Sequence, residues 1–386
     1  RYDYVRLSIN GDSMPIYAVE ENFEKRLIEN NLRKDGVIFR INYDPENRIT
    51  LQQSRSELNE DFMKGKKPLL TSKLNLFFEG KISGSKIFDV RSFAKLYSIL
   101  DLWGNRHAGQ LKNIRLYLNP HTALIEPISY DQQVVWPTEH LGLIGGSKSS
   151  AGVKFQKHFF DMMFDDKNFY RMYMEELNKI SNLNLDLFFS SIEDDLNKKK
   201  YILYKSYPYY ELKSKYPTLE WFWQERNTPF YQNSLWLPSD NYILYNNQQY
   251  IKNALKINKS SLLVNSSSNN SGNISIFLKN NEILPIEITD IKIRDNSVLQ
   301  EKILVQSKNQ LLDNVFLKKV LPIKYTNDFS KNNPNNFSLS YRFLGMDDTL
   351  NSNVKITQHI ISNDEIENRY TLTDYKNSNV KIDKLN

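Results

Sequence analysis

The hydrophobic pattern of this chain changes near residue 255, and that change limits the fold more than any other feature. Between residues 151 and 230, aromatic and aliphatic residues recur at helical spacing. A Ser- and Asn-rich stretch follows, and beyond it apolar and polar residues alternate in short runs such as "LPIEITDIKIRD". Such alternation, with turn residues between the runs, predicts a β-sandwich of about seven strands. We therefore predict two domains, residues 1–255 and residues 256–386.

The first domain is predicted to mix strands and helices. "YDYVRLSING" predicts a strand that ends in an Asn-Gly turn, and "MPIYAVEEN" predicts the returning strand. A helix over "FEKRLIENNLRK", stopped by Gly36, precedes a strand pair in "GVIFRINYD" and "RITLQQSR". Residues 85–102 have the spacing of an amphipathic helix, with Asp89 as its N-cap. The fold class predicted for the whole chain is α+β.

Composition excludes several kinds of site. The 386 residues include no Cys, which rules out disulfides, thiolate metal ligands and a cysteine nucleophile. No run of apolar residues is long enough for a transmembrane helix. The net charge is +6 and the pI about 9.0, but the lysines are scattered along the chain. Scattered lysines indicate a solvated surface, so we predict no nucleic-acid partner.

The segment "NIRLYLNPHTALIEPISYD" holds an amide and a carboxylate, Asn113 and Asp131, 18 positions apart at the two ends of a predicted hairpin. Enzymes that transfer a phosphoryl group hold Mg²⁺ through oxygen ligands of these two types. Asn and Asp are also common loop residues, so closure of a hairpin by turn residues is an alternative explanation. His107 stands six positions before Asn113, in the loop "GNRHAGQLK" that leads to it.

The same segment resembles the core motif of the CotH-type kinases, the atypical kinases related to spore coat protein H. The matching positions are the Asn, the Leu-Tyr strand, Asn119-Pro120, Thr122, Glu126-Pro127-Ile128 and Asp131. The N-terminal segment "VRLSINGDSMPIYAVEENFEKRLIENNLRKDGVIFRIN" resembles the family's strand, hinge and first helix. Its matching positions are Asn10, Gly11, Tyr17, Glu21 and Gly36. The resemblance covers about residues 1–230.

The resemblance implies a protein-kinase-like lobe with a hinge and a helical C-lobe, which binds ATP and Mg²⁺ or Mn²⁺. Asn113 and Asp131 would hold the metal, and Glu21 would lie near the adenine or hinge region. The implied activity is transfer of the γ-phosphoryl of ATP to Ser or Thr of a partner protein. The family also implies a secreted, periplasmic or cell-surface location in a bacterium.

The chain departs from the family pattern at four places, the mildest of which is Tyr130 in place of the Trp before the metal Asp. The catalytic loop of the family carries an Asp after Gly-Asn, whereas this chain has no carboxylate between Asp101 and Asn113. His107 is the candidate for the proton acceptor, because a neutral imidazole accepts a proton near pH 7. A second acid two positions after the metal Asp is replaced by Gln133. The family carries the phosphate-cradling loop and the early-strand Lys of a kinase-like fold upstream of its Asn-Gly strand. Either residue 1 lies inside a longer protein, or the chain lacks this part of the N-lobe, in which case nucleotide binding is not expected.

These departures leave a second hypothesis open. The chain would then be a catalytically inactive pseudokinase or an adhesive surface protein that binds a protein or glycan partner. The glycine-rich stretch "GLIGGSKSS" is interpreted either as a plain connection or as a loop that touches phosphate or substrate. The aromatic run at residues 207–238 is interpreted either as core filling or as a binding surface.

Overall fold

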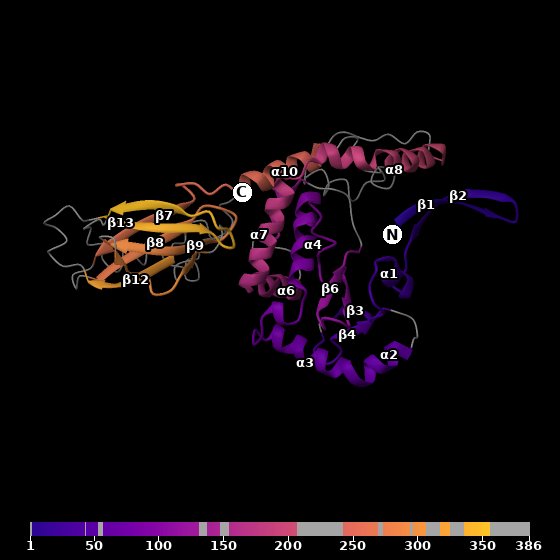
Figure 1. The fold of residues 1–386 in the computed structure, drawn as a ribbon, viewed down its shortest axis with the longest axis horizontal. Coiled ribbons are helices and arrows are strands. Elements are labelled where there is room, and N and C mark those ends of the chain that lie inside the picture. The colour runs from indigo at the N-terminus through magenta and orange to yellow at the C-terminus, as the bar shows by residue number, and fades with distance from the viewer. Residues whose placement is uncertain are drawn as a thin grey trace, which may run out of the picture. The chain divides into compact units, whose positions relative to one another are not determined.

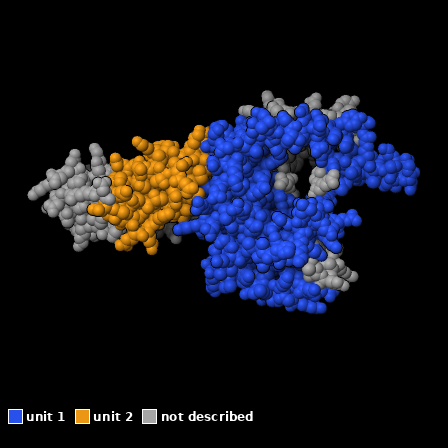
Figure 2. Space-filling model, in the orientation of Figure 1, with its two compact units in different colours: residues 1–144, 149–252 blue, residues 145–148, 253–386 orange. Residues whose placement is uncertain are grey.

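The computed structural model describes residues 2–42, 44–52, 57–130, 137–146, 154–206, 242–268, 273–293, 296–305, 317–324 and 336–355. The chain divides into two compact units (Figure 2). Unit 1 holds residues 1–144 and 149–252, and unit 2 holds residues 145–148 and 253–386. Unit 2 is therefore discontinuous in sequence, and its main part begins three residues before the predicted domain boundary at 255/256.

Unit 1 mixes short strands with longer helices (Figure 1). Its described strands are β1 (Tyr2–Ile9), β2 (Asp12–Glu20), β3 (Ile38–Ile41), β4 (Ile49–Leu51), β5 (Arg115–Leu118) and β6 (Ile125–Ile128). Its described helices are α1 (Lys25–Asn30), α2 (Glu57–Asp61), the π-helix η1 (Phe62–Lys66), α3 (Lys67–Phe78), the 3-10 turn η2 (Gly84–Lys86), α4 (Val90–Trp103), α5 (Thr138–Leu141), α6 (Lys154–Asp165), α7 (Lys167–Ser181), α8 (Leu185–Ser206) and α10 (Tyr242–Ala254).

Several local predictions are confirmed. Asn10 and Gly11 both adopt positive φ in the tight turn between β1 and β2, which is the geometry that Asn-Gly turns favour. The carboxylate of Asp89 accepts a hydrogen bond from the amide of Ser92, so Asp89 is the N-cap of α4. The hairpin after Asn113 is present as the antiparallel pair β5 and β6. Helices α6, α7 and α8 occupy most of residues 154–206, as predicted for the first part of the helical region. Residues 207–230 of that region lie outside the described residues.

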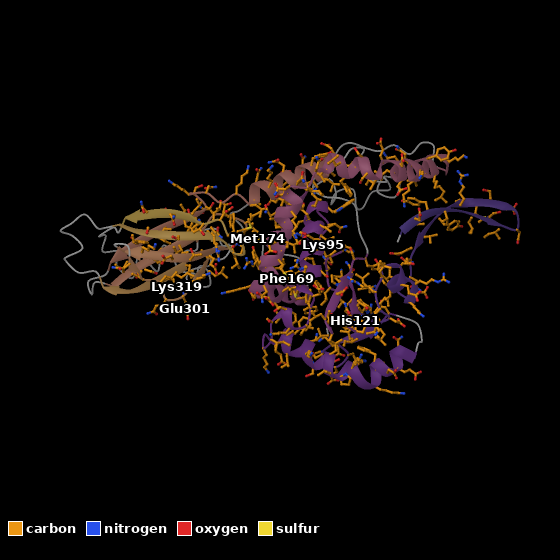
Figure 3. All side chains as sticks on the ribbon, viewed as in Figure 1. Lys95, His121, Phe169, Met174, Glu301 and Lys319 are labelled. Atoms are coloured by element: carbon orange, nitrogen blue, oxygen red, sulfur yellow. The ribbon has the colours of Figure 1, made fainter. Side chains whose placement is uncertain are left out.

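The sheet β4-β3-β5-β6 separates two layers of unit 1. One face contacts α1, where Ile28 packs with Ile38 and Tyr117. On the other side lie rings from α3, α4 and α6 around Phe88, whose backbone forms a bridge with Ile125 of β6. The helix α7 packs on α4 through a fully buried face, on which Figure 3 labels Phe169 and Met174. The hairpin β5-β6 is thereby fixed between α1 and the helical core.

The helix α1 is shorter than predicted, and the prediction that Gly36 stops it is wrong. The helix ends at Asn30, and Leu32 adopts positive φ just beyond it. Gly36 has a different function, because a Cβ atom there would lie 2.7 Å from Cε2 of Tyr117 and 2.8 Å from the carbonyl oxygen of Leu118. The chain needs glycine at this point so that the segment before β3 can pass close to β5.

This close approach predicts that Gly36→Ala will destabilise unit 1 by about 1–3 kcal/mol, because the added methyl group overpacks the contact with β5. The matched control is Gly65→Ala in η1, where a Cβ would meet nothing within 4 Å. Since glycine inside a helix costs roughly 0.5–1 kcal/mol relative to alanine, the control is expected to be neutral or stabilising. Urea unfolding followed by circular dichroism measures both. Equal effects at the two positions would contradict the close-approach argument.

Unit 2 is built from antiparallel strands. The described strands are β7 (Leu262–Ser268), β8 (Asn273–Asn280), β9 (Ile286–Ile293), β10 (Asn296–Ser297), β11 (Ile303–Val305), β12 (Leu317–Lys324), β13 (Asn336–Phe343) and β14 (Leu350–Lys355). Within the described part of the chain they form one sheet of order β12-β8-β7 and another of order β10-β9-β13-β14, with β11 paired to β9. Both sheets contribute fully buried residues, among them Ile276 and Leu339. The predicted alternation is thus present as two antiparallel sheets.

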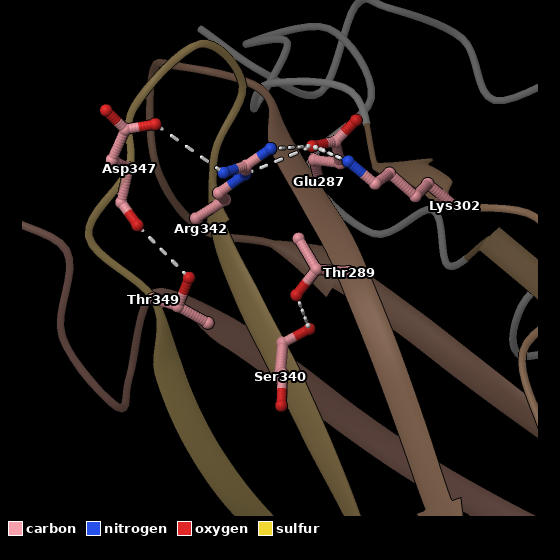
Figure 4. Close-up of polar contacts among 7 residues, drawn as sticks. All are labelled: Glu287, Thr289, Lys302, Ser340, Arg342, Asp347 and Thr349. Atoms are coloured by element: carbon pink, nitrogen blue, oxygen red, sulfur yellow. Dashed lines mark hydrogen bonds and ion pairs between the residues drawn. The ribbon is translucent and has the colours of Figure 1, made fainter. Parts of the chain in front are cut away.

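A buried carboxylate joins the strands of the second sheet of unit 2 (Figure 4). Glu287 of β9 and Arg342 of β13 are cross-strand partners, and Nε and Nη2 of Arg342 donate to Oε2 of Glu287 at 3.1 and 3.0 Å. Lys302 adds an ion pair to the same oxygen at 3.5 Å. Because the carboxylate is buried and has two cationic partners, its charge is compensated where water is excluded.

The described structure therefore agrees with the predicted α+β class and consists of several small antiparallel sheets together with helices. In the part of the chain that the structure describes, none of the helices combines the length and apolarity needed to cross a membrane. The aromatic run at residues 207–238 lies outside the described residues.

Candidate functional site

The loop after α4 brings His107 and Asn113 together. Gly104 ends α4 with positive φ, and the chain then forms a series of turns up to β5. The side-chain amide of Asn113 donates from Nδ2 to the backbone carbonyl oxygen of His107 at 2.9 Å. This bond uses the nitrogen of the amide, so the oxygen Oδ1 is the atom that a cation would take as a ligand. His107 is half-buried in the same loop.

Glu21 lies where β2 ends and the chain turns toward α1. Its carboxylate accepts a hydrogen bond from the side-chain amide of Asn30, the last residue of α1. The bond ties the end of β2 to the C-terminal end of the helix. The half-buried Glu21 is therefore a structural partner of α1, whereas His107 and Asn113 belong to the loop after α4.

Asp131 itself lies outside the described residues, but its neighbour Tyr130 is described. The ring of Tyr130 meets the ring of Phe23 edge to face, with centroids 4.9 Å apart. The guanidinium of Arg115 lies over both rings. Segments that carry three of the sequence-predicted residues thus meet around Arg115: Phe23 is two residues after Glu21, Arg115 is two residues after Asn113, and Tyr130 precedes Asp131.

The other residues of the family-like motif make the turn of the β5-β6 hairpin. Asn119 donates from Nδ2 to Oε1 of Glu126 at 2.6 Å, and its Oδ1 accepts from the amide of His121 at 2.9 Å. Oε2 of the buried Glu126 forms an ion pair with Arg33 at 3.0 Å. Figure 3 labels His121 at this turn. These contacts explain the motif positions Asn119 and Glu126 as structural, in agreement with the hairpin-closure alternative for this part of the motif.

A second polar cluster lies behind the loop, at the C-terminal end of α4. Oδ1 of Asp101 accepts from the amide of Ile144 at 2.8 Å, and Oδ2 accepts from the hydroxyl of Tyr173 on α7. Arg106 donates from Nη2 to the carbonyl oxygens of Gly142 and Leu143, at 2.8 and 3.0 Å. Together these bonds fasten the chain between residues 138 and 144 to α4 and α7. Asp101 is 1% exposed, so it cannot replace the missing catalytic acid of the loop.

Burial raises the pKa of Asp101 from its ordinary value of 3.8 to about 7, against the opposing effects of the Tyr173 hydroxyl, the Ile144 amide and Arg106. The folded state then binds the proton more tightly than the unfolded state does. Stability contributed by this group is present at low pH and decreases as the pH rises from about 4 to about 7, by roughly 4 kcal/mol in total.

Asp101→Asn is therefore expected to remove this decrease, because an amide mimics the neutral carboxyl and does not titrate. The measurement is the difference in free energy of unfolding between the variant and the wild type from pH 4 to pH 8. The variant should gain stability relative to the wild type across this range. If the difference in free energy of unfolding between variant and wild type stays constant from pH 4 to pH 8, the raised pKa of Asp101 is contradicted.

Sequence reasoning missed the residues that organise this region, although a signal for one of them exists. Asp101 follows Tyr97 by four residues on the otherwise apolar face of α4, and a carboxylate in such a position is buried only when it has partners. Arg115 gives no comparable signal, because it starts a strand and an Arg at a strand end is ordinary. Its partners come from segments that are distant in sequence.

Among the described residues, no three or more His, Cys, Asp or Glu side chains are grouped so that they could hold a metal ion. An open depression of about 520 Å³ runs along α3 and is lined mainly by Lys67, Thr71, Ser72, Asn75 and Glu79. None of the sequence-predicted site residues lines it. Gly146, from the glycine-rich stretch, packs in unit 2, where a Cβ would lie 2.6 Å from the carbonyl oxygen of Ile283.

No protein-family model matches the chain, and a search of curated proteins also finds no match.

Proposed function

We propose that the N-terminal part of this chain is a CotH-type, protein-kinase-like domain that transfers the γ-phosphoryl of ATP to Ser or Thr of a partner protein at the bacterial cell exterior. The observation that carries the proposal is the meeting of three segments around Arg115. These segments contain Asn113, the residue before Asp131, and the start of the helix after Glu21. The first two adjoin the paired strands β5 and β6, in which Arg115 lies opposite Ile128, whereas Phe23 stands 92 positions before Arg115. They are the segments on which the resemblance to that family depends.

The donor chemistry fits a divalent cation. The amide of Asn113 is oriented by its bond to His107 so that oxygen is the atom left for the metal, and Asp131 is the carboxylate that the sequence supplies as a second ligand. Bound Mg²⁺ or Mn²⁺ would neutralise charge on the phosphates of ATP. In this proposal Asn113 and Asp131 orient the nucleotide, and His107 accepts the proton of the acceptor hydroxyl.

Burial of Asp101 favours a second candidate, a pseudokinase that binds a protein or glycan partner without phosphoryl transfer. The side chain of Asp101 is occupied by Tyr173 and Ile144, so proton transfer would depend on His107 alone. Loss of the acid that orients the acceptor is expected to reduce transfer while nucleotide binding is kept. The two candidates therefore differ in whether phosphoryl transfer occurs, and both include binding of the nucleotide at the same site.

A thermal-shift titration of the whole chain with ATP and MnCl₂ tests the shared site. At a ligand concentration of 100 times Kd, binding stabilises the native state by about 2.7 kcal/mol, which corresponds to roughly 5–10 °C for a unit of this size. Asp131→Asn should abolish most of the shift. Asp195→Asn, an exposed carboxylate of α8, is the matched control and should retain it. Absence of a shift in the wild type would refute the proposal.

Transfer of ³²P from labelled ATP to protein separates the two candidates. Transfer by the wild type that His107→Ala abolishes supports the kinase. A thermal shift without transfer to any protein favours the pseudokinase.

A further inference from the structure

Positive charge is concentrated in the helical stretch that runs from α2 to α3. The elements α2, η1 and α3 follow one another without interruption from Glu57 to Phe78. The residues Phe62–Phe78 include four Lys and no Asp, Glu or Arg, which gives this part a formal charge of +4. In Figure 1, α2 and α3 run along the lower edge of unit 1. This edge therefore carries a cluster of cations in a chain whose lysines are otherwise scattered.

One side of this stretch belongs to the core of unit 1, and the other side faces water. The buried side chains are Phe62, Leu70, Leu74 and Phe77. On the exposed side, Leu69 stands three positions after Lys66 and four before Lys73, so the three side chains are neighbours on the helix surface. Leu69 is 62% exposed, and Met63 in the preceding turn is 44% exposed. We call Met63, Lys66, Leu69 and Lys73 the cationic face.

The carboxylates at the two ends of the stretch have cationic partners of their own. Oε2 of Glu60 lies 3.8 Å from Nζ of Lys64, and Oε2 of Glu79 lies 2.8 Å from Nζ of Lys81. Glu46 and Lys67 line the depression along α3. No ion pair within the described part of the chain engages the two lysines of the cationic face. Their charge is available to an anionic partner.

A surface that carries phosphate groups above an apolar layer matches both components of the cationic face. Lysines next to an anionic bilayer are attracted to the headgroup phosphates, and exposed apolar side chains enter the boundary between headgroups and acyl chains. An acidic polymer would engage the lysines alone and would leave Leu69 and Met63 in water. An isolated exposed Leu is ordinary on a protein surface. The position of Leu69 between two lysines is what favours a bilayer over an acidic polymer.

We propose that the cationic face docks unit 1 on an anionic lipid bilayer, with Lys66 and Lys73 at the headgroup phosphates and Leu69 and Met63 inserted between the headgroups. The helices lie on the bilayer and do not enter it further, because their other side stays in the core of unit 1. Clusters of about 4–8 lysines or arginines on an amphipathic helix bind anionic lipids, and this stretch supplies four. None of these residues belongs to the predicted nucleotide site, so the inference is independent of the proposed phosphoryl transfer.

Cosedimentation of the whole chain with vesicles tests this docking. The vesicles consist of phosphatidylcholine alone or of phosphatidylcholine mixed with phosphatidylglycerol. The wild type should bind only the vesicles that contain phosphatidylglycerol, and high salt should release it, because salt screens the attraction between exposed charges. Absence of binding to the mixed vesicles at low salt would refute the proposal.

Two variants locate the contact, and each has a matched control on α8. Lys66→Gln combined with Lys73→Gln should lower the partition coefficient on mixed vesicles at least about tenfold. Lys198→Gln combined with Lys200→Gln makes the same change in net charge at exposed positions and should retain binding.

Leu69→Ala should lower the partition coefficient about tenfold, since less apolar surface enters the headgroup boundary. Its control is Leu187→Ala, because Leu187 is 68% exposed and should contribute nothing to binding. Circular dichroism first establishes that every variant is folded.

The controls and the apolar variant each give the experiment a contradicting outcome. If the α8 lysine variant loses as much binding as the variant of Lys66 and Lys73, binding follows net charge and the cationic face is not the contact. If Leu69→Ala binds the vesicles as the wild type does, no apolar side chain is inserted. The lysines then fit an acidic polymer equally well, and docking on a bilayer is refuted.

Discussion

Asp101→Ala is expected to lower the free energy of unfolding of unit 1 by about 3–5 kcal/mol, the cost of removing one partner from a buried charged network. The substitution leaves the amide of Ile144 and the hydroxyl of Tyr173 buried without their acceptor. It also removes the carboxylate whose charge compensates the half-buried guanidinium of Arg106. Each unsatisfied buried group adds about 1–3 kcal/mol.

Asp101→Asn and Tyr173→Phe are the controls for this result. Asp101→Asn keeps a side-chain oxygen that can accept from the amide of Ile144 and has no charge to bury, so at pH 7 this variant should be far more stable than the alanine variant. Tyr173→Phe removes a single hydrogen bond and should cost about 1 kcal/mol. The measurement is chemical denaturation at pH 7 with separate probes for the two units, because a chain of two units need not unfold in one step. A loss below about 1 kcal/mol for Asp101→Ala would show that the network is not structural.

Phe88→Ala is expected to cost about 3–5 kcal/mol through the cavity that it leaves. The ring of Phe88 is fully buried and lies 5.2 Å from Phe77, 5.3 Å from Phe93 and 5.7 Å from Phe159, measured between centroids. These rings belong to α3, α4 and α6, so the cavity would open where three helices meet. The backbone of Phe88 also forms the bridge to Ile125 that holds β6.

Leu69→Ala is the control for the loss of a large apolar side chain, because Leu69 of α3 is 62% exposed. Its effect should lie within about 0.5 kcal/mol of zero. Since Phe88 belongs to unit 1, the thermal transition of unit 1 should shift and that of unit 2 should stay. A shift of both transitions, or an effect of Phe88→Ala as small as that of the control, would contradict the described packing.

The sequence predicted the features of this chain that depend on neighbouring residues. The Asn10-Gly11 turn, the Asp89 cap and the hairpin after Asn113 each follow from residues within a few positions of one another. Gly36 shows the limit of such reasoning. A glycine after a helical pattern suggests a helix stop, but the actual constraint comes from Tyr117, 81 positions away.

Less of the candidate site was predictable, because several of its contacts join residues that are distant in sequence. The bond from Asn113 to the backbone carbonyl of His107 joins residues six positions apart within one loop. The network of Asp101 with Tyr173, and the stacking of Arg115 on Phe23, join residues that only the tertiary fold brings together. Periodicity gives the buried face of a helix, but it does not give the partner of a polar group on that face.

The discontinuity of unit 2 has a practical consequence for dissecting this protein. A fragment that starts at residue 253 would lack Gly146, which packs against the Ile283 backbone. Such a fragment would expose the peptide group of Ile283 that Gly146 covers. If the fragment aggregated, the missing segment would be the cause and not an intrinsic property of the strands. Genetic exchange of this part between proteins would likewise require three crossover points, at 144/145, 148/149 and 252/253.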